Sequence, residues 1–228
     1  MKKEIKIEVP TKWSAVTLKD YLALRKDMET YKDNEEALFA CLLHHLCHFP
    51  LEYLQQLDID TYIGIKKDVT GFFNNVEESL HRIITIDGVE YGFEPNLSQM
   101  AYGAYVDISK YENVGIDDKW AEIMSILYRP IKTKMGALYD IETYTGAVDS
   151  EKFLDVTMDV HFGALFFFNN LQKDLLNATL KSLKGELMGM DLPLKLKQIL
   201  DVNGETTHQS FNWHKEMSQK LIQLSENH

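Results

Sequence analysis

Residues 60–75 read DTYIGIKKDVTGFFNN and residues 159–170 read DVHFGALFFFNN, so an aspartate, a glycine four residues later and the run FFNN recur in the same order. Two helical stretches upstream of each copy also recur at matched spacing. Ordered self-similarity of this kind indicates a repeated supersecondary unit. We therefore predict two pseudo-repeated helical halves, at about residues 8–80 and 93–183, within one compact unit that spans residues 1–228.

The two copies of the repeated word differ in polarity. The first copy carries Lys66 and Lys67 where the second carries apolar side chains such as Leu165. We expect the first copy to lie near solvent and the second to be buried. The aspartates that open the copies, Asp60 and Asp159, could form a functional carboxylate pair, but we interpret them as caps of the helices that follow.

Residues 82–93, RIITIDGVEYGF, alternate apolar and polar side chains on both sides of an Asp-Gly dipeptide. This pattern predicts a β-hairpin with a type I′ turn. Residues 3–9, KEIKIEV, also alternate and can join the hairpin as a third strand, because an isolated hairpin is marginally stable.

The rest of the chain has a helical pattern. Thr17 and Asn34 stand where helix N-caps are expected, and residues 184–228 form a C-terminal helical extension. The predicted fold is therefore mainly α, a helical domain of two pseudo-repeated halves with a small antiparallel β element.

The chain has a net charge of −11, from 24 lysines and arginines against 35 aspartates and glutamates. Binding to a phosphate backbone needs clustered cations, so we expect no nucleic-acid partner. No apolar run approaches the roughly 20 residues of a membrane-spanning helix, and the first residues lack the pattern of a signal peptide. We expect no membrane association.

Metal-ligating side chains are concentrated in one stretch, residues 41–48, which reads CLLHHLCH. On a helix, Cys41 and His45 share a face, as do His44 and His48, so zinc binding is geometrically conceivable. A second ligand pair is missing, and cysteine is often buried as an apolar residue. We keep these four residues as weak metal candidates and expect no metal and no other cofactor.

Catalytic and phosphate-binding motifs of known spacing are missing from the sequence, including GxxxxGK[ST], GxGxxG and GxSxG. We therefore assign no catalytic residue and expect no enzymatic activity. A small metal-dependent enzyme that uses the Cys41–His48 helix is kept as an alternative.

Five residues are candidates for a protein interface. Tyr128 and Arg129 stand at a helix end before a proline, where the arginine either complements the helix dipole or anchors a partner. Phe166 and Phe167 lie on a helix that is apolar on all sides, which indicates either core or a subunit contact. Trp213 lies on the final amphipathic helix, which either packs back on the domain or reaches a neighbouring subunit.

Four segments together resemble small virion-morphogenesis proteins of tailed bacteriophages. They are FEPNLSQMAYGAYVDISKY (93–111), DDKWAEIMSILYRPI (117–131), YDIETYTG (139–146) and MDVHFGALFFFNNLQKDLL (158–176). The segments VPTKWSAVTLKDYLALRK (9–26) and LEYLQQLDIDTYIGI (51–65) resemble the pattern of phage tail-assembly chaperones. Similar proteins occur in crAss-like and related podoviruses, and the resemblance covers most of residues 8–183.

This resemblance implies a non-enzymatic role in virion or tail assembly through binding to other phage structural proteins, with self-association to a homo-oligomer as a further possibility. It transfers no functional residue. The hairpin and the C-terminal extension depart from the chaperone pattern, so a stoichiometric virion component (a portal-proximal ring, an adaptor or an internal cargo protein) stays open as an alternative. The expected location is the host cytoplasm during assembly, and the virion for a structural component.

Overall fold

The structure is a computed structural model that describes residues 7–73, 75–76, 79–96, 99–110, 116–146, 149–168, 170 and 219. The contacts within the chain divide it into two compact units. That both belong to one domain spanning residues 1–228 stays a prediction. Unit 1 consists of Met1–Glu77, Leu154–Asp159 and His214–His228. Unit 2 consists of Glu78–Phe153 and Val160–Trp213.

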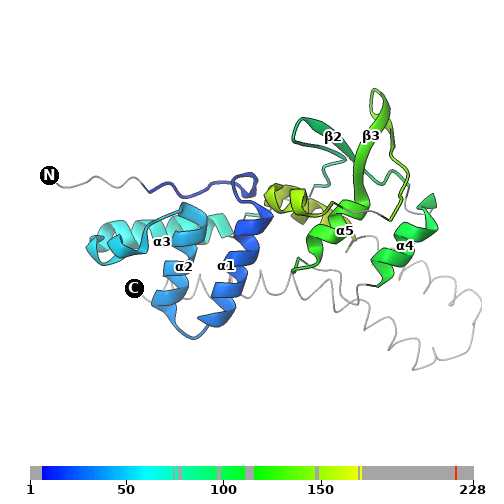
Figure 1. Ribbon diagram of the computed structural model, residues 1–228. Helices are drawn as coiled ribbons and strands as arrows, with labels where there is room; N and C mark the ends of the chain where they lie inside the picture. Colours follow the sequence, from blue (N-terminus) through cyan, green and yellow to red (C-terminus); the bar gives the residue numbers. More distant parts are fainter. Residues whose placement is uncertain are drawn as a thin grey trace, which may run out of the picture. The chain divides into compact units, whose positions relative to one another are not determined.

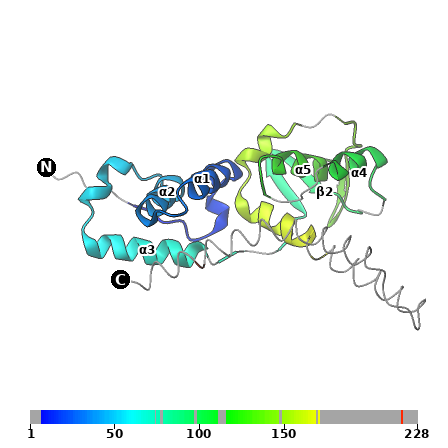
Figure 2. The same ribbon diagram turned by 90° about the horizontal axis from the view of Figure 1, so that it is seen from below.

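Unit 1 is helical. Its described elements are η1 (Trp13–Ala15), α1 (Leu18–Thr30), α2 (Glu35–Cys47), η2 (Leu51–Gln56) and α3 (Ile59–Phe73). Helices α1 and α2 lie side by side, and the axis of α3 runs across both of them (Figures 1 and 2). The predicted caps are confirmed, because the side chains of Thr17 and Asn34 accept hydrogen bonds from the backbone N–H groups of Asp20 and Ala37.

An aromatic cluster fills the core of unit 1. The ring of Trp13 lies 4.4 Å from Phe72, 5.3 Å from Phe73 and 5.9 Å from Tyr21, measured between ring centroids. All four side chains are buried. The two phenylalanines belong to the first FFNN run, so this run holds α3 against the start of the chain.

Unit 2 contains a four-stranded antiparallel sheet in the order β1-β2-β3-β4. Its described elements are β1 (Ile83–Ile86), β2 (Val89–Phe93), α4 (Tyr102–Ser109), α5 (Trp120–Leu127), β3 (Tyr128–Met135) and β4 (Leu138–Ile141), together with the first three residues of η4 (Glu151–Asp155). The fold is therefore mixed α/β, which corrects the prediction of a mainly α protein.

The hairpin predicted at 82–93 is confirmed as β1 and β2. Asp87 and Gly88 have φ values of 51° and 78°, as a type I′ turn requires. The predicted third strand at 3–9 is not confirmed: residues 7–9 form no strand, and residues 3–6 lie outside the described residues. The third and fourth strands of the sheet instead come from residues 128–141: the start of β3 pairs with β2, and β4 pairs with β3.

The pseudo-repeated halves are not shown by the described elements. Residues 8–73 contain helices, whereas the region from 93 to 168 contains two strands as well as helices. Most of the predicted C-terminal extension, 184–228, lies outside the described residues.

Residues 158–168 form a helix that is buried along most of its length, as its apolar composition predicted. In unit 2 its His161 is fully buried, and Nδ1 of its ring accepts a hydrogen bond of 3.1 Å from Nε1 of Trp120. Phe167 packs edge-on against Phe93 at the end of β2, at 5.2 Å between ring centroids. This helix and α5 thus form the apolar layer beneath the sheet.

Candidate protein-binding surface

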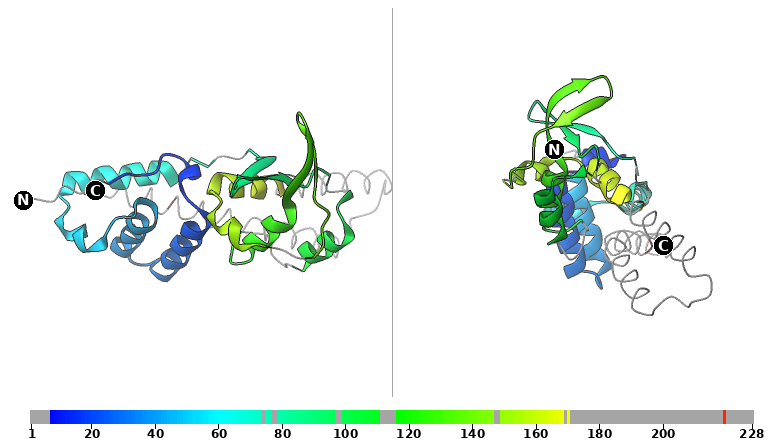
Figure 3. Two further views of the ribbon diagram at one scale, coloured as in Figure 1. Left: turned by 45° about the horizontal axis from the view of Figure 1, so that its top comes forward. Right: turned by 90° about the vertical axis from the view of Figure 1, so that its right-hand side faces the viewer.

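The outer parts of β3 and β4 form a two-stranded ribbon, residues 131–141. Strand β2 pairs with β3 only over Tyr128–Pro130, and from Ile131 onwards the partner of β3 is β4. The strands are joined through Gly136, whose φ of 63° suits glycine. Figures 1 and 3 show this ribbon extending beyond the helices of its own unit.

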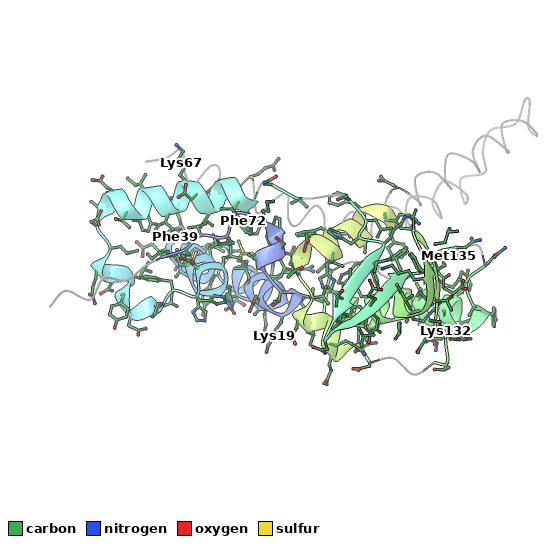
Figure 4. The ribbon with its side chains drawn as sticks, turned by 90° about the horizontal axis from the view of Figure 1, so that it is seen from above. Lys19, Phe39, Lys67, Phe72, Lys132 and Met135 are labelled. Carbon is green, nitrogen blue, oxygen red and sulfur yellow. The ribbon has the colours of Figure 1, made fainter. Side chains whose placement is uncertain are left out.

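The tip of the ribbon is apolar and exposed. Met135 and Leu138 face each other across the strand pair and are 80% and 74% exposed. Their neighbours Lys132 and Lys134 are also exposed (Figure 4 labels Lys132 and Met135). Large apolar side chains that stay exposed together on a short ribbon bury little surface when the unit folds and add little to its stability. They are therefore candidates for contact with another protein.

Lysines give the ribbon a local positive charge on an acidic chain. Residues 131–141 contain two lysines and one aspartate. Nζ of Lys134 lies 2.6 Å from the carboxylate of Glu90 on β2, and the hydroxyl of Thr133 donates to Asp140 at 3.1 Å. The pair with Glu90 is exposed and adds little stability, but it balances the charge of Lys134, so Lys132 is the cation that the ribbon presents to a partner.

The base of the ribbon is fixed by Tyr139 of β4. Its ring covers Gly92 of β2, where an added Cβ would lie 2.4 Å from a ring carbon. Its hydroxyl lies 2.7 Å from the carbonyl oxygen of Phe93 and 3.1 Å from that of Arg82. Burial raises the pKa of this phenol, which therefore stays protonated and able to donate. Glycine at position 92 makes this anchoring possible, because any side chain would displace the ring.

Arg129 and Tyr128, the predicted interface residues at the start of β3, are used inside unit 2. Nη2 of Arg129 lies 2.5 Å from Oε2 of Glu94, and Nη1 donates to the carbonyl oxygen of Ile126 in the last turn of α5. Both side chains of the ion pair are about nine-tenths buried. The interpretation of Arg129 as a cation at a helix end fits this geometry.

Tyr128 is 1% exposed, and its hydroxyl donates to the carbonyl oxygen of His81 at 2.6 Å. Burial raises the pKa of the phenol. Neither Tyr128 nor Arg129 therefore offers a partner much surface, and replacing Arg129 would strand the carboxylate of Glu94 in the interior.

A cavity of about 180 Å³ lies at the base of the ribbon. Its lining includes the aromatic rings of Tyr91, Tyr128, Tyr144 and Phe153 together with the side chain of Lys152. This pocket opens to solvent.

Two of the polar side chains around this pocket, Lys152 and Tyr144, are paired within the unit. Nζ of Lys152 donates to the hydroxyl of Tyr91 at 2.8 Å and to Asp149 at 2.9 Å, and these bonds raise the pKa of the ammonium. The hydroxyl of Tyr144 donates to Asp107 of α4 at 2.5 Å. Burial, followed by this hydrogen bond, raises the pKa of Tyr144 to about 12.

The four weak metal candidates do not converge. Nε2 of His45 is bound to the carboxylate of Asp27 at 2.8 Å, and His48 ends α2 with a left-handed backbone conformation. Burial raises the pKa of the Cys41 thiol, which disfavours the thiolate that a metal requires. Among the described residues, no three His, Cys, Asp or Glu side chains are grouped as metal ligands.

The remaining predicted site residues lie elsewhere. Phe166 is 8% exposed and belongs to the core, Phe167 packs against β2, and Trp213 lies outside the described residues. The cap of α3 is Asp58, whose carboxylate accepts from N–H and Oγ1 of Thr61, so the assignment of a cap to Asp60 was wrong. Asp159 is the second residue of its helix and is buried.

The exposed ribbon was missed by sequence reasoning. The stretch LYRPIKTKMGALYDI contains a weak signal, since a Gly-Ala pair separates Met135 from Leu138 and β-type residues precede it. Pro130 and the irregular register between Ile131 and Thr133 break the strict alternation by which strands are recognised.

Comparison with known proteins gives no significant match, whether with protein-family models, with curated proteins or with solved structures. Among the described residues, none of the helices combines the length and the apolar character that a bilayer-spanning helix needs.

Proposed function

We propose that this chain is a non-enzymatic protein that takes part in bacteriophage virion or tail assembly by binding other proteins of the particle. The observation that carries the binding role is the ribbon, where Met135 and Leu138 are both more than 70% exposed beside two lysines. The phage context rests on the sequence resemblance given above.

The ribbon suits a binding role for energetic reasons. A two-stranded ribbon alone is marginal in water, and two apolar side chains at its tip gain free energy only when another surface covers them. Burying a side chain of this size is worth roughly 1.5–3 kcal/mol. Its base, by contrast, is fixed by Tyr139 and by the internal ion pair of Arg129, so the tip is presented on a rigid support.

The test uses the phage that encodes this protein. The gene is deleted and supplied in trans as the natural chain, as Met135→Glu/Leu138→Glu, or as the matched control Tyr102→Glu/Tyr105→Glu, which places the same charges on exposed side chains of α4. Loss of hot-spot side chains weakens binding roughly 30-fold or more. We therefore expect the ribbon variant to lower the yield of infectious particles strongly and the α4 control to preserve it.

A deletion that leaves particle yield unchanged would overturn the assembly role. Equal yields from the ribbon variant and the α4 control would overturn the assignment of the binding surface. Mass spectrometry of purified particles then distinguishes the two forms of the proposal, because a virion component is retained at high copy number and an assembly chaperone is not.

A further inference from the structure

A second exposed apolar pair lies in unit 1, at the start of α3. Ile59 and Ile63 are 76% and 44% exposed, and a spacing of four residues places them on one face of the helix. Asp58 and Asp60 flank Ile59 and are also exposed. We call these four residues the α3 end.

The charge of the α3 end is negative. Residues 49–65 contain Glu52, Asp58 and Asp60 but no lysine or arginine. Hydrogen bonds from Thr61 lower the pKa of Asp58, so its carboxylate stays ionised. The nearest exposed cation along the helix is Lys67, which points away from Phe39 and Phe72 (Figure 4).

The ribbon tip and the α3 end are complementary in chemistry. The tip offers two exposed apolar side chains beside the exposed cation Lys132, with Lys134 paired to Glu90. The α3 end offers two exposed apolar side chains beside two aspartates. Opposite charges around an apolar contact favour the correct partner and speed its encounter. Every copy of the chain carries both surfaces.

We propose that the ribbon tip of one copy docks on the α3 end of a second copy, an inference that rests on the proposed protein-binding role of the ribbon. The contact joins two different surfaces, so it is heterologous. Repetition of a heterologous contact produces a closed ring or an open chain of subunits. The surfaces are small, and small interfaces are weak and reversible.

The experiment is sedimentation velocity on the full chain over a series of protein concentrations, at low and at physiological salt. The average mass should rise with concentration, and added salt should reduce the association because it screens the attraction between Lys132 and the aspartates of the α3 end. Docking of the ribbon tip within one chain would not depend on concentration, so a constant monomer mass would overturn the proposal.

Two variants each remove one side of the contact. Met135→Glu/Leu138→Glu alters the tip, and Ile59→Glu/Ile63→Glu alters the α3 end. Each should weaken self-association at least about tenfold, as expected for the centre of an interface. The control Tyr102→Glu/Tyr105→Glu should associate like the natural chain. All positions are exposed, and circular dichroism checks that each variant is folded.

Mixing the two variants is the decisive measurement. Each variant keeps the surface that the other lacks, so an equimolar mixture should form dimers that grow no further. A mixture that stays monomeric while the natural chain associates would overturn the head-to-tail contact. Loss of particle assembly with the ribbon variant, in a protein that never self-associates, would overturn this inference and leave the proposed function intact.

Discussion

The two copies of the repeated word, in α3 and in the helix at 158–168, have the same opening pattern and opposite environments. In α3 the glycine, Gly64, faces open space, and the second and third residues after it are the buried Lys66 and the exposed Lys67. In the second helix the corresponding glycine, Gly163, lies against the backbone of Ser79, and the residues around it are buried. The same sequence pattern therefore occurs in a helix that is exposed on one side, α3, and in a helix that is buried along most of its length, residues 158–168.

The buried lysine of α3 explains how the polar copy is accommodated. The side chain of Lys66 is 6% exposed, and its Nζ lies 2.7 Å from the carboxylate of Glu35, which opens α2 and is 39% exposed. The corresponding position in the second helix is Leu165, which is 1% exposed. A partner carboxylate near solvent makes the lysine tolerable in α3, whereas the second helix has apolar surroundings.

Placing a lysine at the apolar position of the second copy should give the largest change in the free energy of unfolding. Leu165→Lys places an ammonium in an apolar core, and we expect a loss of about 4 kcal/mol or more in the free energy of unfolding. Urea unfolding followed by circular dichroism measures it.

The matched control is Lys66→Leu in α3. It removes a buried charge and leaves Glu35 solvated, so we expect a change of less than about 1 kcal/mol. If Leu165→Lys unfolded at the same urea concentration as the natural chain, the second copy would not be a core helix.

The two glycines give the next effect. Gly163→Ala would place a Cβ 2.3 Å from the carbonyl oxygen of Ser79, a backbone atom that cannot rotate away. We expect a loss of about 3 kcal/mol in unfolding free energy, measured by urea titration.

Gly64→Ala should act in the opposite direction. Its Cβ would meet no other atom within 4 Å, and alanine favours a helix over glycine by about 1 kcal/mol. Equal effects of the two substitutions, in sign and size, would show that the copies are packed alike.

The smallest effect concerns the starts of the two helices and depends on pH. Asp58 caps α3, and its pKa is lowered by hydrogen bonds from Thr61, whereas Thr157, which cannot titrate, stands at the corresponding position of the second helix. A lowered pKa gives stability that is present above the unfolded value near 3.8 and is lost as pH falls through the folded value.

Asp58→Asn keeps the capping oxygen and removes the titration. Its unfolding free energy should approach that of the natural chain as pH falls from about 5 to about 3. Urea unfolding at these two pH values checks this. A difference that stays constant between them would mean that the Asp58 carboxylate is not stabilised in the folded chain.

Local signals in the sequence predicted local structure well. Thr17 and Asn34 cap α1 and α2, and Asp87-Gly88 closes the hairpin, because each of these features depends on neighbouring residues alone. The burial of the helix at 158–168 also followed from its composition. The orientation of the protein-binding candidates did not follow from local signals. Arg129 points inward to Glu94, 35 positions away in the sequence, and Tyr128 points inward to His81, 47 positions away.

The sequence by itself determined the caps, the type I′ turn and the apolar character of the second helix, because these depend on the conformational preferences of a few adjacent residues. Only the tertiary structure decided that residues 128–141 form strands, since Pro130 and an irregular register hide their alternation until β2 offers a backbone edge. The tertiary structure also decided the environment of each copy of the repeated word. Distant parts of the chain place open space beside Gly64 and a backbone carbonyl beside Gly163, and they place the carboxylate of Glu35 next to Lys66.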